Sequence, residues 1–205
     1  MKKVILGATG SIGSSLAKKL VDSGEQVHLV GRDEGSLSEL ANELNSTFTT
    51  CDVLEENFSE KIINDLKDEQ VNGLAYCVGS IDLKPLKLTK KSDFMQSFNL
   101  NLVSATEIIK SLADNLKASK GSIVLFSTVA VQQGFPNHAI VSSAKGAVEG
   151  LTLALAAEYA PNIRVNCIAP SLTNSKISNF LLKNEKMAES LSLIHISEPT
   201  RLTMI

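Results

Sequence analysis

The stretch KVILGATGSIG, residues 3–13, decides the fold. Its apolar run Lys3–Leu6 predicts a strand, its glycines Gly7, Gly10 and Gly13 predict a tight turn, and a helical pattern follows. Glycine lets a backbone turn sharply and approach a ligand closely, and the amide groups at the start of a helix attract anions. A strand, a glycine-rich turn and a helix in this order therefore predict a phosphate-binding βα unit.

The rest of the chain continues the alternation of strand and helix. Short β-branched runs predict strands at Lys3–Leu6, Gln26–Val30, Ser46–Thr50, Gly73–Cys77, Ser122–Ser127 and Ile163–Ile168. Amphipathic patterns predict helices at residues 11–23, 34–44, 55–68, 92–117 and 138–159. Such an alternation forms parallel sheets through right-handed crossovers. We therefore expect an α/β fold, a Rossmann-type doubly wound parallel sheet that binds its ligand at the carboxyl ends of the strands.

Composition restricts the classes of function. The 205 residues are 43% hydrophobic and 20% charged, which suits one globular domain with a substantial core. The formal net charge is −2 and Lys and Arg are scattered, so we expect small-molecule partners rather than nucleic acid or a membrane. Cys51, Cys77 and Cys167 lie in apolar runs, which predicts reduced thiols and no metal site. We find no apolar leader and no membrane-length run, and expect a cytoplasmic protein.

The residue that follows the second predicted strand bears on the choice of cofactor. There the chain reads Val30-Gly31-Arg32. A carboxylate at this place binds the ribose diol of NAD, whereas a guanidinium suits the 2′-phosphate of NADP. Arg32 therefore favours NADP(H) over NAD(H) as the cofactor, and a solvated loop arginine is the alternative interpretation.

Several further segments resemble, in the right order, the short-chain dehydrogenase/reductase family across residues 3–176. Residues 51–53, CDV, resemble the segment whose aspartate meets the adenine ring, and Gly79 is the last residue of the family's Asn-Asn-Ala-Gly. Residues 163–170, IRVNCIAP, are similar to the segment before the nicotinamide-side loop. Two departures are Ser11 in place of the middle glycine and Ser171 in place of a later one.

The glycine turn and the resemblance together assign a set of cofactor-binding residues. They are Gly7, Thr9, Gly10, Ser11, Ile12, Gly13, Arg32, Asp52, Val53, Gly79, Lys145, Pro170 and Ser175. Family members are usually homo-oligomers and continue with another helix and strand. We therefore expect the domain to be a homo-oligomer when complete and to be truncated here before its final strand.

The tail differs from the rest of the chain. Residues 191–201, LSLIHISEPTR, match codon for codon a transposase adapter used in short-read sequencing libraries. We therefore expect a C-terminally incomplete dinucleotide-binding domain at 1–190 and a non-native tail at 191–205. This interpretation removes His195 from the catalytic candidates. A native amphipathic tail is the alternative.

The resemblance also implies a catalytic set, which this chain keeps in part. Asn101 and Lys145 occupy the positions of the family's asparagine and lysine, and Thr128 occupies the position of its serine. Threonine still supplies a hydroxyl. Val141, four residues before Lys145, stands where the family has its tyrosine, and valine cannot exchange a proton.

Another group would then have to supply the proton. In a helix His138 lies on the same face as Val141 and Lys145, and imidazole can donate a proton near neutral pH. The alternative is that His138 is a partly exposed residue at the helix start. Tyr76, at the end of the fourth strand, is a weaker candidate for the donor.

Two functions are compatible with these residues. The first is an NAD(P)-dependent oxidoreductase that transfers hydride between NADP(H) and a carbonyl/alcohol substrate, with Asn101, Thr128, Lys145 and His138 at its site. The second is a non-catalytic protein that binds NADP(H) without turnover. The fold alone does not choose between them, because function depends on the site. We favour the enzyme, because the hydroxyl, amide and amine are all kept.

Overall fold

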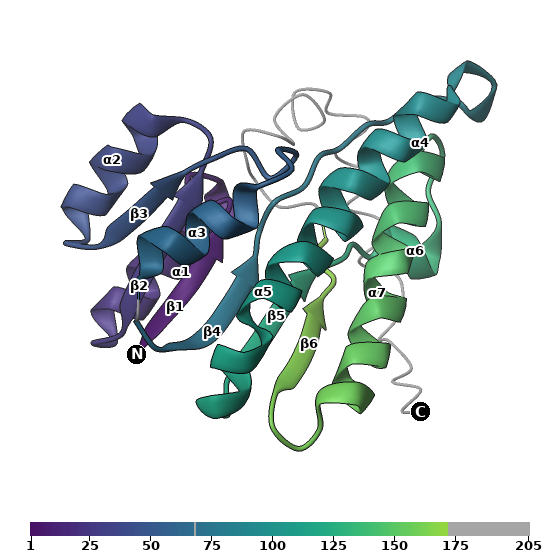
Figure 1. Ribbon diagram of the computed structural model, residues 1–205. Coiled ribbons are helices and arrows are strands. Elements are labelled where there is room, and N and C mark those ends of the chain that lie inside the picture. The colour runs from purple at the N-terminus through teal and green to yellow at the C-terminus, as the bar shows by residue number, and fades with distance from the viewer. Residues whose placement is uncertain (68, 172–205) are drawn as a thin grey trace. The chain divides into compact units, whose positions relative to one another are not determined.

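The computed structural model describes residues 1–67 and 69–171 (Figure 1). Within them, six parallel strands form one sheet in the order β3-β2-β1-β4-β5-β6. They are β1 (Lys2–Leu6), β2 (Gln26–Gly31), β3 (Thr47–Thr50), β4 (Val71–Tyr76), β5 (Ser122–Phe126) and β6 (Arg164–Ile168). The order reverses between β1 and β4, which confirms the Rossmann-type doubly wound parallel sheet. The expectations for Ser175, for a final strand and for the 191–205 tail lie outside the described residues.

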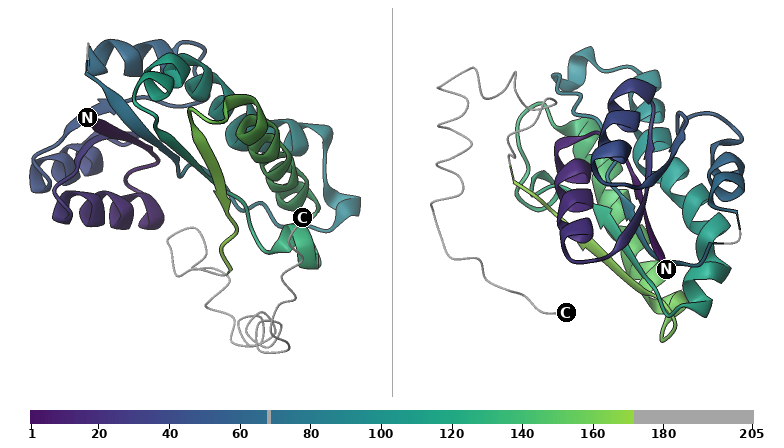
Figure 2. Two further views of the ribbon diagram at one scale, coloured as in Figure 1. Left: turned by 90° about the horizontal axis from the view of Figure 1, so that it is seen from below. Right: turned by 90° about the vertical axis from the view of Figure 1, so that its left-hand side faces the viewer.

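Helices cover both faces of the sheet (Figure 2). One face carries α1 (Ser11–Asp22) and α2 (Glu34–Glu43), and the other carries α3 (Phe58–Leu66), α5 (Ser104–Ala118) and α7 (Ala139–Tyr159). Successive strand residues point to opposite faces. In β1, Val4 and Leu6 join the core under α3, α5 and α7, whereas Ile5 joins the core under α1 and α2. Both faces are therefore buried, and the loops after the strands are left to form a site.

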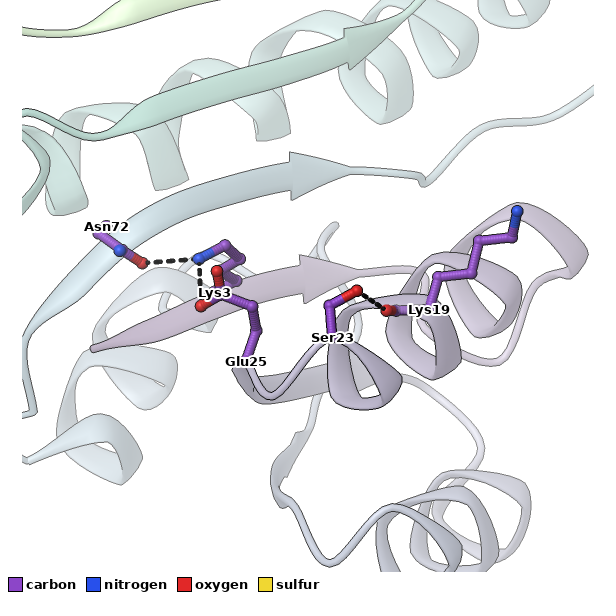
Figure 3. Close-up of polar contacts among 5 residues, drawn as sticks. All are labelled: Lys3, Lys19, Ser23, Glu25 and Asn72. Atoms are coloured by element: carbon purple, nitrogen blue, oxygen red, sulfur yellow. Dashed lines mark hydrogen bonds and ion pairs between the residues drawn. The ribbon is translucent and has the colours of Figure 1, made fainter.

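Lys3 ties the start of β1 to both neighbouring strands (Figure 3). Its Nζ donates to Glu25 Oε2 at 2.7 Å, just before β2, and to Asn72 Oδ1 at 3.3 Å in β4. A Cβ at Gly73 would lie only 3.0 Å from Lys3 Cγ. Glycine at this position therefore leaves room for the Lys3 side chain to reach Asn72. The strand β4 begins at Val71, two residues before the start that the sequence predicted.

The prediction of a single helix at residues 92–117 is wrong in one respect, because the structure divides this segment into three parts. It consists of α4 (Lys91–Phe98), a π-helical turn η2 (Asn99–Val103) and α5. The Ser104 amide donates five residues back to the Asn99 carbonyl, and the Ser104 hydroxyl donates to the same oxygen at 2.8 Å. The turn thus accommodates one residue more than an α-helix would. Two short elements, η1 (Leu86–Leu88) and α6 (Ala130–Gln133), were also not predicted.

The length and composition of α7 correct another expectation. Its 21 residues, with a hydropathy of 1.3, would suffice to cross a membrane, contrary to the expected absence of such a run. In this fold α7 lies against the sheet instead. Ile140, Ala144 and Val148 are buried there, and Lys145 is buried with them.

A chain of hydrogen bonds crosses from β1 to α3 beneath the edge strand β3. Lys2 Nζ donates to Thr47 Oγ1 at 2.9 Å, and Thr49 Oγ1 donates to Asp65 Oδ2 at 2.6 Å. The imidazole of the fully buried His28 lies between the two threonines, with Nδ1 2.8 Å from Thr47 Oγ1 and Nε2 2.9 Å from Thr49 Oγ1. Because the Thr49 hydroxyl proton is used on Asp65, Nε2 carries a proton and Nδ1 accepts one from Thr47. His28 is therefore neutral, and the donor and the acceptor of each hydrogen bond in this chain are fixed.

Candidate functional site

The glycine-rich turn between β1 and α1 is packed too closely for side chains. Gly7 has a φ of +74°, and a Cβ there would lie 2.9 Å from the carbonyl carbon and oxygen of Cys77. A Cβ at Gly13 would lie 2.3 Å from the Gly7 oxygen. Both positions therefore require glycine, and the turn brings the start of α1 up to the end of β4.

The first turn of α1 is suited to bind an anion. Gly10 is the N-cap residue, and no side chain among the described residues caps this helix. The amide groups of Ser11 and Ile12 follow directly, and Thr9 precedes the cap. Free amides and the positive end of a helix dipole attract a phosphate. This turn therefore fits the pyrophosphate of a dinucleotide.

The carboxyl ends of β2 and β3 bring Arg32 and Asp52 together. The Arg32 guanidinium is 76% exposed, and its Nη1 lies 3.6 Å from Asp52 Oδ2. Asp52 Oδ1 accepts from the Leu54 amide at 3.0 Å, while Val53 is buried beside it. An ion pair this long and this exposed is weak, so it leaves much of the positive charge of the guanidinium available. Arg32 is therefore free to meet a second anion at this edge.

The position before Arg32 is a glycine, which presents no carboxylate to a ribose. A Cβ at Gly31 would make ordinary van der Waals contacts, 3.4 Å from Leu37 Cδ1 and 3.6 Å from Thr9 Oγ1. The next acidic side chain, Asp33, accepts from the Ser36 amide at 2.8 Å and caps α2. The cation at the end of β2 is therefore Arg32, with the carboxylates of Asp33 and Asp52 following β2 and β3.

The π turn η2 holds Asn101 in a fixed orientation. Its Nδ2 donates to the Ser97 carbonyl at 2.8 Å, and the Tyr76 hydroxyl donates to the Leu100 carbonyl at 2.7 Å. The side chain of Asn101 is buried, yet its Oδ1 has no hydrogen-bond partner within the described residues. An unpaired buried acceptor is costly unless a ligand or water completes it. Asn101 Oδ1 therefore marks a place for a bound polar group.

Gly79, Asn101 and Lys145 converge at this place. A Cβ at Gly79 would lie 3.1 Å from Asn101 Oδ1 and 3.2 Å from Lys145 Nζ. Lys145 is buried, and burial lowers the pKa of its amine to about 8, with Cys167 and Cys77 acting weakly in the opposite direction. The structure thus brings together three residues that the sequence placed in one site, from η2, from α7 and from the segment after β4.

The other predicted catalytic residues lie around the start of α7. Thr128 follows β5 and is partly buried, and its Oγ1 accepts from the Ala130 amide at 3.3 Å. Val141 is buried in the first turn of α7, so no phenol reaches the site from this position. Pro170, after β6, is partly buried, and its carbonyl accepts from the Val129 amide at 3.3 Å.

His138 is the N-cap residue of α7 rather than a member of its first turn. Its Nδ1 donates to the Pro136 carbonyl at 2.8 Å, because a carbonyl oxygen can only accept. Its ring packs on Phe135 with 5.3 Å between the ring centroids. In the described residues no hydrogen bond or ion pair joins His138 to Asn101 or Lys145. The structure therefore favours the interpretation of His138 as a residue of the helix start.

Sequence reasoning missed a polar pair behind Lys145. Ser127 is buried, and its Oγ donates to Glu149 Oε1 at 2.5 Å and lies 3.4 Å from the Lys145 carbonyl. This pair joins the end of β5 to α7. The only available clue was that Glu149 follows Lys145 by four residues, which places both on one helix face.

The parallel sheet, the glycine turn and the uncapped α1 define a dinucleotide-binding α/β protein. Residues 7–198 match the family described as enoyl-(acyl carrier protein) reductase. The chain belongs to the short-chain dehydrogenase/reductase family, as its sequence motifs indicated.

Similar proteins are oxidoreductases of this family. L-fucose dehydrogenase of Oryctolagus cuniculus is 33% identical over 172 residues, which cover 82% of this chain and 61% of that protein. A tropinone reductase homologue of Arabidopsis thaliana is 34% identical over 197 residues, which cover 91% of this chain and 75% of that protein. The solved structure of a serine dehydrogenase complexed with NADP+ has a TM-score of 0.83 at 21% identity, over 93% of this chain and 81% of that one. The chain thus spans about three fifths of the first of these relatives.

Proposed function

We propose that the protein binds NADP(H) and catalyses hydride transfer between it and the carbonyl or alcohol group of a small molecule. The observation that carries this proposal is the convergence of the Lys145 amine and the unpaired Asn101 oxygen over Gly79. Both groups are buried at the ends of the central strands, where a doubly wound sheet binds its ligand. When bound, the cofactor would supply the hydride.

The preference for NADP(H) rests on Arg32. A guanidinium forms charge-assisted hydrogen bonds to a phosphate, and each contributes roughly 1.5–3 kcal/mol. Arg32 is exposed at the end of β2, and among the described residues its ionic contact is with Asp52, at a distance of 3.6 Å that leaves the guanidinium able to meet a phosphate. Asp33 is engaged in capping α2. The same edge offers little to the ribose diol of NAD(H).

Each residue of the site has a distinct task in this proposal. The amides at the start of α1 would hold the pyrophosphate, and Arg32 would hold the 2′-phosphate. The Lys145 ammonium would hydrogen-bond the nicotinamide ribose and stabilise negative charge on the substrate oxygen. The Thr128 hydroxyl would donate to that oxygen, which is compatible with the bond that it accepts from the Ala130 amide. Asn101 Oδ1 would accept from the group or water that Lys145 contacts.

One observation favours a second function, namely binding without turnover. Val141 is 5% exposed and leaves the usual position of the proton-donating phenol filled with hydrocarbon. A protein with this site could keep the cofactor through α1, Arg32 and Lys145 and lack catalysis.

Two measurements on the same preparation distinguish these functions. Calorimetric titration should show binding of NADPH at least about tenfold tighter than binding of NADH, as one charge-assisted contact implies. The absorbance of NADPH, followed with a panel of aldehydes and ketones, should then show substrate-dependent oxidation. Tight NADPH binding with no oxidation on the whole panel would favour the binding protein. Equal affinities for the two cofactors would contradict the proposed role of Arg32.

A further inference from the structure

We propose that the Lys145 ammonium is itself the proton donor in carbonyl reduction, the role that a tyrosine has in the family. This inference rests on the proposed function. As hydride from a reduced nicotinamide forms the new C–H bond, the carbonyl π electrons move to oxygen. That oxygen takes a proton from Lys145 Nζ, whose N–H electron pair stays on nitrogen. The products are an alcohol, an oxidised nicotinamide and a neutral lysine amine, which solvent then reprotonates.

The environment of Nζ suits a proton donor. Lys145 is 8% exposed, and its amine has no hydrogen bond or ion pair with any described residue. It faces the same small volume as Asn101 Oδ1, since both atoms lie within 3.2 Å of one point beside Gly79. A cation without a carboxylate partner keeps its protons available to a substrate. The buried amide oxygen beside it can hold a water molecule through which the amine regains its proton.

The other candidate donors are engaged elsewhere. The Nδ1–H of His138 donates to the Pro136 carbonyl, and no hydrogen bond or ion pair among the described residues joins its ring to Asn101 or Lys145. The Tyr76 hydroxyl donates to the Leu100 carbonyl, and burial raises the pKa of this phenol well above its ordinary value. Val141 has no exchangeable proton. Of the four residues compared, His138, Tyr76, Val141 and Lys145, only Lys145 has an acidic proton at the site that no described residue accepts.

The groups around Lys145 are compatible with its release of a proton. Burial lowers the pKa of the amine to about 8, and the thiols of Cys77, which follows β4, and of Cys167 in β6 oppose this shift weakly. Burial raises the pKa of both thiols, so they remain neutral. Glu149 on α7 is the nearest acid along the same helix face, and it is hydrogen-bonded to Ser127. A donor with a pKa close to the working pH is an efficient general acid.

The decisive variant is Lys145→Arg, with Lys110→Arg as its matched control. Arginine keeps the positive charge and the hydrogen-bond donors, but its high pKa prevents proton transfer. Lys110 lies on α5 with its side chain 79% exposed, away from the site. We expect Lys145→Arg to bind NADPH and to lose turnover by ~10²-fold or more, whereas Lys110→Arg keeps the wild-type rate. The rate of carbonyl reduction by the wild type should fall as the pH rises above about 8, the pKa of the amine.

A readout that does not depend on turnover comes from NMR of protein labelled at the lysine ε-carbons. The signal that is absent in Lys145→Arg should titrate near pH 8, well below the exposed lysines. Titration together with the exposed lysines, or turnover that survives Lys145→Arg, would overturn the proposal. Turnover that survives Lys145→Arg but is lost in His138→Ala would assign the proton to the histidine. A wild type that binds NADPH and reduces no carbonyl would instead overturn the proposed function, and this inference with it.

Discussion

Acidification should destabilise the protein through His28, the neutral imidazole buried between Thr47 and Thr49. Burial, and after it the positive charge of Lys2, lower its pKa from 6.5 to about 4, against weaker opposing effects of Asp65 and Glu69. A proton on Nδ1 would face the Thr47 hydroxyl, which would have to rotate and give up its bond to the ring. The folded protein therefore resists protonation at this site.

The size of the effect follows from linkage between protonation and folding. Between pH 6.5 and about 4 the unfolded chain carries a proton on this imidazole and the folded protein does not. The free energy of unfolding therefore falls as the pH falls through this range, by about 1.4 kcal/mol per pH unit. The total loss from His28 is about 3 kcal/mol, which is a large fraction of the roughly 5–15 kcal/mol that stabilises a typical domain.

Urea denaturation followed by circular dichroism, at pH values from 7.5 to 4, would measure this loss. The control is His28→Gln, whose amide can still donate to Thr49 but does not titrate. Carboxylates titrate in both proteins, so the difference between the two curves isolates His28. We expect the wild type to lose about 3 kcal/mol more than the variant by pH 4. Parallel curves would show that the imidazole is not held neutral, and would refute the directed hydrogen-bond chain.

Three substitutions test the cofactor and substrate sites. Arg32→Ala should weaken NADPH binding about tenfold and leave NADH binding nearly unchanged, as measured by calorimetric titration; an equal loss for both would contradict the 2′-phosphate contact. Gly13→Ala should weaken the binding of both cofactors at least about tenfold, because the new Cβ displaces the Gly7 carbonyl and this overpacking costs roughly 1–3 kcal/mol. Unchanged affinities would show that the turn can adjust to the extra methyl group. Val141→Tyr should raise the rate of carbonyl reduction, toward the lower end of ~10²–10⁴-fold because Lys145 already donates the proton. Overpacking by the ring should lower the free energy of unfolding by roughly 1–3 kcal/mol. A folded, NADPH-binding but inactive Val141→Tyr protein would argue against an intact reductase site.

The sequence predicted those features of the fold that depend on the spacing of residues close together in the chain. The glycine turn follows from the short interval between Gly7 and Gly13, which only a strand, a turn and a helix can accommodate. Alternation of apolar runs and amphipathic patterns was enough to predict the parallel sheet. The nearness of Lys145 to Gly79, far apart in the chain, was available only through resemblance to a family.

Features that depend on tertiary contacts were out of reach. One extra residue in η2 hardly disturbs a helical pattern that extends over residues 92–117, so the division into α4 and α5 was not visible. The bond between Ser127 and Glu149 joins a strand end to a helix, and no spacing rule connects them. The capping position of His138 also depended on where α7 begins, and helix ends are the least predictable part of such patterns.

The π turn makes the placement of the Asn101 amide depend on the number of residues in the turn. The turn accommodates one residue more than an α-helix would, so one deletion within residues 99–103 would let α4 and α5 merge into a continuous α-helix. The flanking helices would keep their facing, whereas residues inside the turn would move around the axis by up to about 100°. Asn101 would then leave its place, even if every neighbouring side chain were preserved. Exchanges of residue type at the other positions of this turn should therefore be tolerated more readily than any change in its length.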